Sequence, residues 1–215
     1  MELTVLYRGD ARLPVASSRA KRLLDVVVSA LSLVVFAPIF ALVSLAIVAD
    51  SGGSPFYSQY RTGFEGRRFR IWKFRTMVRD AETQRAELLA LNEAPFPAFK
   101  IRNDPRVTRV GRILRRSSAD ELPQLWNVLL GDMSLVGPRP LPTIEADALD
   151  SAGRQRLLAR PGITGLWQLS NRHAQQSDFS DWLEKDLAYM DGWSLGRDLI
   201  ILVRTAGAVV RMTGR

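Results

Sequence analysis

Residues 26–48 read VVVSALSLVVFAPIFALVSLAIV, and this run sets the architecture of the chain. It contains no charged residue, and only three serines and one proline interrupt its apolar side chains. A run of this length is sufficient to cross a bilayer as a helix. A core helix in so small a protein would rarely be apolar on every face, and the apolar part of a cleaved signal peptide is typically shorter. The run therefore predicts a helical segment embedded in a membrane.

Basic residues flank this run on both sides, with Lys21 and Arg22 before it and Arg67 and Arg68 after it. Because cytoplasmic flanks carry the excess of Lys and Arg, neither end is a candidate for export. Pro38 lies close to the middle, where it removes a backbone hydrogen bond and bends a helix. These features favour a re-entrant helix–break–helix hairpin that enters one leaflet and returns. A single spanning helix is the alternative, because prolines also occur in helices that cross membranes.

The remainder of the chain predicts an α+β fold that is mainly α. Short alternating stretches at 56–60 and 69–75, joined through turn residues 62–66, predict a small β-hairpin. Residues 80–93 have high helix propensity and begin with an aspartate suited to an N-cap. Residues 195–212 predict a basic amphipathic helix, which would lie on an anionic membrane surface or pack against the domain.

The chain is strongly basic and has no cysteine. Thirty Lys and Arg against 22 Asp and Glu give a formal net charge of +8 and an isoelectric point of about 10.5. This excess indicates an anionic partner: nucleic acid, acidic lipid or a phosphorylated substrate. The lack of cysteine excludes disulfides, thiolate metal sites and cysteine nucleophiles. A single histidine, His173, excludes a histidine-rich metal site.

Two adjacent acids, Asp120 and Glu121, follow an arginine-rich stretch. Adjacent carboxylates amid concentrated positive charge suit a magnesium-assisted attack on a phosphate ester. The same residues have a structural interpretation, because Ser118 and Glu121 have the spacing of a capping box and acids are favoured in a first helical turn. A helix beginning at Ser118 would end at Gly131, a common residue type after a helix C-terminus. Taken alone, this stretch is explained more often by capping than by catalysis.

Arginines gather in two further places. Arg106 and Arg112 belong to a stripe along a predicted helix, and a solvated basic face explains such a stripe at least as well as a phosphate-binding site. Arg139 lies between Pro138 and Pro140, which fix the backbone on each side. An arginine held in this way suits a phosphate group, although a tight connection between elements would have the same sequence.

Six short motifs follow one another along the chain, and the likeness to which they belong covers nearly everything from Lys21 to about Arg211. Any one of them would be weak evidence of kinship, whereas six in register make a coincidental match very improbable. They are KRxxD (21–25), KFRTM (73–77), DPRVT (104–108), DELPQLWNV (120–128), GDMSLVGPRP (131–140) and PGITGLWQ (161–168).

These motifs, in this order, resemble those of the bacterial sugar transferase family, the monotopic phosphoglycosyl transferases that load a sugar-1-phosphate onto polyprenyl phosphate. The resemblance implies a monotopic membrane protein of the bacterial inner membrane, with its active site on the cytoplasmic face. It implies three parts: an N-terminal extension at 1–20, the re-entrant hairpin at 21–49, and a cytosolic catalytic domain with membrane-interface helices at 50–215. Longer members carry a large multi-span region before this part, so the chain looks like a minimal catalytic version.

The resemblance also implies a magnesium-dependent pair formed by Asp120 and Glu121. Asp120 is expected to attack the phosphate that bears the sugar, releasing UMP and leaving an aspartyl-phosphosugar intermediate. A first-turn helical position would help Asp120 stay ionised. Glu121 is expected to act as general base or to aid magnesium binding. Phosphate oxygens are assigned to Lys73, Arg106 and Arg139, with Arg75 and Arg112 as weaker candidates.

The implied partners are a UDP-sugar, undecaprenyl phosphate and membrane lipids, with no nucleic acid. UDP-glucose or UDP-galactose is expected, because the motif around Trp167 is similar to that of the exopolysaccharide-initiating branch. Trp126 and Trp167 are expected to pack in the core. The rival functions are a non-catalytic membrane-anchored assembly factor, a tethered nucleic-acid binder and an alcohol phosphatidyltransferase. The possibility of a homo-oligomer stays open.

Overall fold

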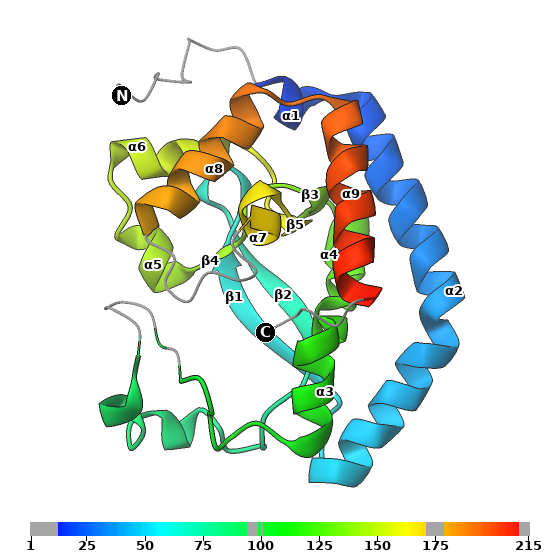
Figure 1. Cartoon of the computed structure of the whole chain (residues 1–215), viewed down its shortest axis with the longest axis vertical. Helices are drawn as coiled ribbons and strands as arrows, with labels where there is room; N and C mark the ends of the chain where they lie inside the picture. The colour runs from blue at the N-terminus through cyan, green and yellow to red at the C-terminus, as the bar shows by residue number, and fades with distance from the viewer. Residues whose placement is uncertain (1–12, 94–98, 100, 171–178, 211–215) are drawn as a thin grey trace.

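The computed structural model describes residues 13–93, 99, 101–170 and 179–210. His173 lies outside the described residues. The chain is mainly helical with two small sheets, which confirms the predicted α+β fold that is mainly α (Figure 1). The helices are α1 (Pro14–Ser17), α2 (Arg19–Ser51), α3 (Arg109–Ser117), α4 (Gln124–Leu130), α5 (Thr143–Asp147), α6 (Ser151–Arg154), α7 (Leu166–Ser170), α8 (Phe179–Asp191) and α9 (Leu195–Val210). The strands are β1 (Phe56–Thr62), β2 (Arg68–Phe74), β3 (Ser134–Val136), β4 (Leu141–Pro142) and β5 (Gly162–Thr164).

The apolar run forms most of α2, which continues through Pro38 as one helix. Figure 1 shows α2 bowed outward from the rest of the molecule, while its two ends approach the domain. The interruption expected at Pro38 is therefore absent, and the hairpin form of this segment is not confirmed. A proline inside a long helix costs one backbone hydrogen bond locally and is compatible with a bend.

The outer side of α2 has no partner within the described part of the chain. Leu31, Val34 and Leu42 are 61%, 75% and 67% exposed, and only 6% of the most apolar window of the helix is buried. Among the described residues α2 is the one helix long and apolar enough to cross a membrane. Such exposure distinguishes it from the core helix of a soluble protein, which buries its apolar residues. Leu199 and Val203 of α9 are also exposed apolar residues.

The N-terminal end of α2 is attached to the domain by buried charges. Lys21 Nζ donates to Asp198 Oδ2 at 2.7 Å and to the Val136 carbonyl at 3.0 Å. Asp25 accepts a hydrogen bond from the Leu135 backbone at 3.0 Å. Lys21, Asp25 and Asp198 are 5%, 2% and 0% exposed, so all three lie in the protein interior. The KRxxD motif is thus the joint between the helix and the strand β3.

The C-terminal end of α2 contacts a different part of the same domain. Ile47 is buried against Phe74 of β2 and Leu114 of α3. Asp50 accepts a hydrogen bond from the Val110 backbone in the first turn of α3 at 3.0 Å. The two ends of α2 are therefore both attached to one domain.

The sheets carry three of the six motifs. The predicted hairpin is confirmed, since β1 and β2 pair antiparallel from Phe56–Phe74 to Thr62–Arg68, and β4 extends this sheet from β1. Strand β3 pairs in parallel with β5 from the PGIT motif. The two segments approach each other there so closely that a Cβ on Gly162 would lie 2.1 Å from the Gly137 nitrogen. Only glycine fits at such a backbone approach.

Residues 80–93 do not form the predicted helix. They contain the short 3₁₀ turns Thr83–Arg85 and Leu89–Leu91 instead. Leu89 and Leu91 are 59% and 55% exposed, so the segment has no core to pack against. Propensity alone seldom holds a helix of this length in water, which explains why the prediction is wrong.

The capping interpretation of Ser118 is also wrong. Ser118 has φ of 56° and ends α3, with its backbone N–H donating to the carbonyls of Leu114 and Arg115. Its side chain makes no N-terminal cap bond, and the next α-helix begins only at Gln124, after Pro123. The predicted end of that helix is confirmed, because Gly131 follows it with φ of 92°.

Removing the buried cation at the N-terminal joint is expected to destabilise the whole domain. Lys21→Met leaves the Asp198 carboxylate buried without its ion pair, a change that typically costs about 3–5 kcal/mol. Thermal melting of the detergent-solubilised protein would show a clear fall in Tm. The exposed pair Arg68–Asp147, at 3.5 Å, supplies the control, since Arg68→Gln should cost no more than about 1 kcal/mol. Equal Tm values for the two variants would contradict this account.

Candidate active site

Asp120 and Glu121 occupy a short 3₁₀ turn, Ala119–Glu121, between the end of α3 and the start of α4. The left-handed Ser118 reverses the chain before the turn, and Pro123 follows it. Both acidic side chains line a cleft of about 1160 Å³. Its described lining contains eight arginine or lysine residues against four aspartate or glutamate residues, so the cleft attracts anions.

Glu121 is the fixed member of the pair. Lys73 Nζ on β2 donates to its Oε1 at 2.9 Å, and Arg139 Nη2 approaches the same oxygen at 3.4 Å. Burial alone would raise the pKa of Glu121, but the charges and hydrogen bonds of Lys73 and Arg139 outweigh it and lower the pKa to about 2. Glu121 is therefore ionised throughout the physiological range.

Asp120 differs from its neighbour in both bonding and basicity. Within the described residues its carboxylate accepts no hydrogen bond. Burial raises its pKa and Glu121 adds to this effect, although Lys73, Arg115 and Arg139 act in the opposite direction. Asp120 lies in a 3₁₀ turn rather than in the first turn of an α-helix, and desolvation is the largest influence on its pKa. The site thus contains one anchored carboxylate and one unengaged carboxylate of increased basicity, which suits a nucleophile.

The backbone of Arg139 is fixed by a buried ion pair between Arg156 and Asp186. Arg156, which is 2% exposed, donates through Nη2 to the Arg139 carbonyl at 2.9 Å and to the carboxylate of Asp186. Its guanidinium also lies over the ring of Trp182, 4.7 Å from the centroid. The prolines around Arg139 were the only sequence signal for a fixed backbone. Nothing in the sequence alone pointed to Arg156 or Asp186, which come from distant elements.

The other predicted phosphate ligands lie in or near the cleft but are engaged elsewhere. Arg75 lines the cleft and donates to the Ser51 hydroxyl at 2.9 Å, at the end of α2. Arg106 is 5% exposed, and its guanidinium donates to both oxygens of Asp104 and to the Ala81 carbonyl. In this arrangement Arg106 stabilises the loop before α3 rather than presenting free donors.

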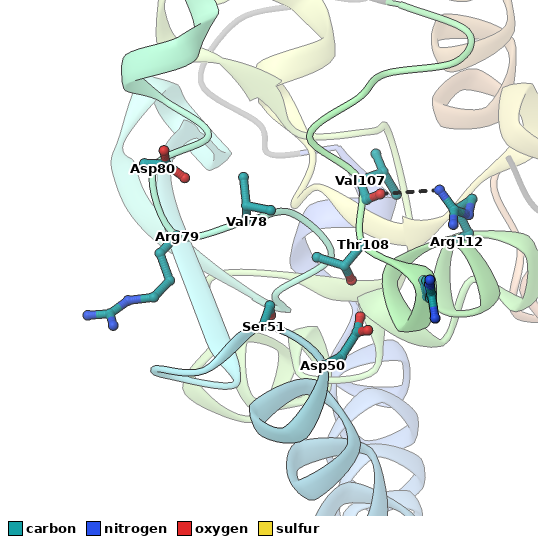
Figure 2. Close-up of a pocket in the computed structure, with 9 residues that line it drawn as sticks. Asp50, Ser51, Val78, Arg79, Asp80, Val107, Thr108 and Arg112 are labelled. Atoms are coloured by element: carbon teal, nitrogen blue, oxygen red, sulfur yellow. Dashed lines mark hydrogen bonds between the residues drawn. The ribbon is translucent and has the colours of Figure 1, made fainter.

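Arg112 lies apart from the acidic pair. It borders a separate hollow of about 460 Å³ at the C-terminal end of α2, together with Asp50 and Thr108 (Figure 2). Its Nη1 donates to the Val107 carbonyl at 3.4 Å. Of the five predicted basic residues, Lys73 and Arg139 are the two that the structure brings into contact with Glu121.

Four arginines that line the cleft were absent from the predicted site residues: Arg61, Arg79, Arg85 and Arg115. Arg115 lines the cleft near Asp120 and donates through Nε to the Thr76 hydroxyl at 3.0 Å. Arg61 lines it from β1. The alternation of side chains along the hairpin was a usable signal for Arg61, because this residue shares a face of the sheet with Lys73.

The tryptophans differ from the expectation of core packing. Trp126 on α4 is 52% exposed, and its prediction is wrong. Trp167 borders the cleft and stacks on Trp182, with ring centroids 4.6 Å apart. An exposed tryptophan on a helix beside α2 is typical of a membrane–water interface, where the ring has both apolar and polar surroundings.

The acidic pair fits a magnesium ion that shares its ligands with a substrate. No group of three or more His, Asp or Glu side chains is gathered for a metal in the described residues. Magnesium, however, commonly takes only one or two carboxylates and completes its shell with phosphates and water. Asp120 and Glu121 supply two such carboxylates in a cleft of suitable charge.

Comparison with known proteins identifies the family to which a chain with this site belongs. A family model described as "Bacterial sugar transferase" matches residues 16–212. The chain belongs to the bacterial sugar transferase family. The match includes α2 and every residue of the cleft described above. A transferase of sugar phosphates is therefore confirmed as the class of this enzyme.

Named relatives place the chain in the exopolysaccharide-type part of the family. The exopolysaccharide production protein ExoY of Rhizobium meliloti is 40% identical, over 91% of this chain and 87% of its own length. The UDP-glucose:undecaprenyl-phosphate glucose-1-phosphate transferase of Caulobacter vibrioides is 41% identical, over 97% and 76%. The undecaprenyl-phosphate galactose phosphotransferase of Salmonella typhimurium is 40% identical over 98% of this chain, which spans 44% of that longer protein.

The raised pKa of Asp120 predicts the acidic limb of the pH–rate profile. If ionised Asp120 is required, activity falls as the pH decreases through its raised pKa, above the usual aspartate value of about 4. Because Lys73 lowers the pKa of Asp120, Lys73→Met should move this limb further toward neutral pH. The measurement is kcat/KM against pH, with Arg68→Gln as a charge-matched surface control. If the acidic limb of the Lys73→Met profile lay at the same pH as in the wild type, the assignment of this limb to Asp120 would be contradicted.

Proposed function

We propose that this enzyme transfers a sugar-1-phosphate from a UDP-sugar to undecaprenyl phosphate, releasing UMP and forming undecaprenyl-diphosphate-sugar. The observation that carries the proposal is the Asp120 carboxylate, which accepts no hydrogen bond from the described residues, beside the ion-paired Glu121 in a basic cleft of a chain with an exposed apolar helix. The relatives' names supply the two substrate classes. The step would be the first membrane reaction in the synthesis of an exopolysaccharide or another surface glycan.

In the first half-reaction, an Asp120 oxygen attacks the phosphorus that bears the sugar. The bond to the bridging oxygen of the diphosphate breaks, and UMP leaves with the electron pair. The product is an aspartyl-phosphosugar on the protein. Asp120 suits this role because no hydrogen bond from the described residues has to be broken before attack.

In the second half-reaction, undecaprenyl phosphate attacks the aspartyl-phosphosugar and regenerates the free carboxylate. Both halves bring anions together, so fixed positive charge is the main requirement for catalysis. Lys73 and Arg139 provide it at Glu121, and Arg115 provides it near Asp120. Glu121 holds these two cations in place, and its pKa of about 2 makes it a weak base, so its proposed role is to fix charge rather than to accept a proton.

Magnesium is the proposed cofactor. Asp120 and Glu121 would hold it together with phosphate oxygens of the donor, and the ion would offset the negative charge of the diphosphate. Glu121 is already ionised, which is the form that a metal requires.

The proposed location is the cytoplasmic face of the bacterial inner membrane, with α2 as a re-entrant element. Attachment of both ends of α2 to one domain supports this arrangement over a single span. Exposed apolar residues on α9 beside α2 support interfacial helices. The proposed donor sugars are glucose and galactose, as in the names of the relatives.

Substitution of the two acids should separate their roles. Asp120→Asn removes the nucleophile, and we expect loss of both UMP release and labelled sugar-phosphate on the protein. Glu121→Gln leaves a nucleophile in place but removes the charge that anchors two cations, so turnover should fall by about 100-fold or more. Retained UMP release by a folded Asp120→Asn enzyme would eliminate Asp120 as the nucleophile. A near-normal rate for Glu121→Gln would remove Glu121 from the chemistry.

Removal of magnesium should stop the reaction reversibly. Chelation with EDTA is expected to abolish UMP release from UDP-glucose and UDP-galactose, and added Mg²⁺ should restore it. Release of UMP at full rate in EDTA would rule out the proposed cofactor. Failure of every UDP-sugar to react with undecaprenyl phosphate and Mg²⁺ would favour a non-catalytic assembly factor.

A further inference from the structure

Arg61 is a basic residue of the cleft that the mechanism above does not use. Its Nη2 donates to Gln59 Oε1 at 3.0 Å, while its Nε is buried and has no hydrogen-bond partner. Within the described ranges no carboxylate forms a salt bridge with it. A partly buried cation is ordinarily paired with an anion, so this side chain lacks the partner that its position calls for.

The hairpin places Arg61 and Lys73 on the same side of the sheet. Lys73 of β2 is paired with Tyr57 of β1, and Arg61 lies four residues further along β1. Alternate residues of a strand face the same side, and four residues of extended chain span about 13 Å. Both side chains line the cleft. Positive charge therefore extends along the hairpin from Lys73 beside the acidic pair to Arg61.

Arg139 is near both of these cations, since it shares Glu121 with Lys73 and its charge acts on Arg61. Arg61 is paired with Pro142 of β4, which brings the segment carrying Arg139 alongside β1. The Arg139 side chain reaches Glu121 at 3.4 Å, and Glu121 in turn accepts from Lys73. Burial and the neighbouring charge of Arg139 lower the pKa of Arg61 to about 10. Two guanidinium groups this near to each other repel, and an anion bound by both relieves the repulsion.

Glu145 is the nearby carboxylate that has to be considered as a competing partner. It influences the pKa of Arg61 electrostatically, and the charges of Arg61, Arg139 and Arg156 act on it in turn. It forms no salt bridge with any of them within the described residues. The space beside Arg61 and Arg139 is therefore suited to a further anion.

We propose that Arg61 and Arg139 together bind the phosphate that leaves with the nucleotide. The UDP-sugar would then lie along the hairpin, with its sugar-bearing phosphate at Asp120 and its nucleoside toward Arg61. As the bond from Asp120 to phosphorus forms, the bond to the bridging oxygen breaks and the electron pair stays on the departing UMP. Both guanidinium groups offset that charge, and no proton transfer is needed. This inference rests on the proposed function and adds the direction in which the donor is bound.

The decisive measurement is inhibition by UMP, since UMP contains the departing phosphate but neither the transferred sugar nor the lipid. Arg61→Gln should raise the inhibition constant of UMP and the KM of the UDP-sugar by a similar factor, on the order of tenfold or more. Arg61→Lys keeps the charge but loses the two-pronged contact, so it should fall between wild type and Arg61→Gln. Arg68→Gln makes the same charge change on an exposed position of the same hairpin and should leave both constants unchanged.

The second half-reaction supplies an independent readout. When wild type and Arg61→Gln carry equal amounts of labelled sugar-phosphate, transfer of the label to undecaprenyl phosphate should proceed at the same rate, because the nucleotide has already left. An unchanged UMP inhibition constant in Arg61→Gln would overturn the proposal. A slowed second half-reaction with normal UMP inhibition would also overturn it and assign Arg61 to the lipid phosphate. If Arg61→Gln fails to fold, as judged by its melting curve, the comparison of Arg61→Lys with wild type decides. Absence of UMP release from the wild-type enzyme would instead reject the proposed function.

Discussion

The buried contact between Lys21 and Asp198 joins the apolar helix to the catalytic domain, and the geometry of the site depends on it. Lys21 also binds the carbonyl of Val136, at the end of the strand from which the Arg139 loop departs. A buried charge is tolerated only when its partners are complete, and here the cation has a carboxylate and a carbonyl in direct contact. The membrane element and the position of a phosphate-binding arginine are thus connected through one ammonium group.

The cleft itself works through a division between two neighbouring carboxylates. Glu121 forms ion pairs with Lys73 and Arg139 and so fixes their positions, while Asp120 accepts no hydrogen bond from the described residues. Burial raises the pKa of both acids, but only Glu121 has cations in direct contact, so the net pKa of Glu121 is lowered while that of Asp120 is raised. One residue organises the positive charge and the next is available for bond formation.

Much of this was predictable from local sequence. The hairpin followed from alternation and Gly131 from its role after a helix. The Asp120–Glu121 pair became a candidate site only through the six motifs along the chain, because its own setting favoured capping. The failures were of two kinds. The helix expected at 80–93 and the cap at Ser118 were wrong because tertiary context overrode local preference. Arg115 and Arg156 were missed because their importance arises from contacts with segments distant in the chain, which no local pattern records. Arg61 differs, because alternation along the hairpin places it on the same face as Lys73.

The attachment of α2 at both ends has a consequence for how the enzyme meets its lipid substrate. A helix fixed at one end can swing, whereas one fixed at two separate places on a rigid body cannot tilt independently of that body. In the proposed arrangement, with its middle in the lipid, α2 would keep the cleft at a constant height above the bilayer. Recognition of the proposed carrier would then take place at its phosphate head, at a set depth, and the length of the hydrocarbon tail below would contribute little to the fit.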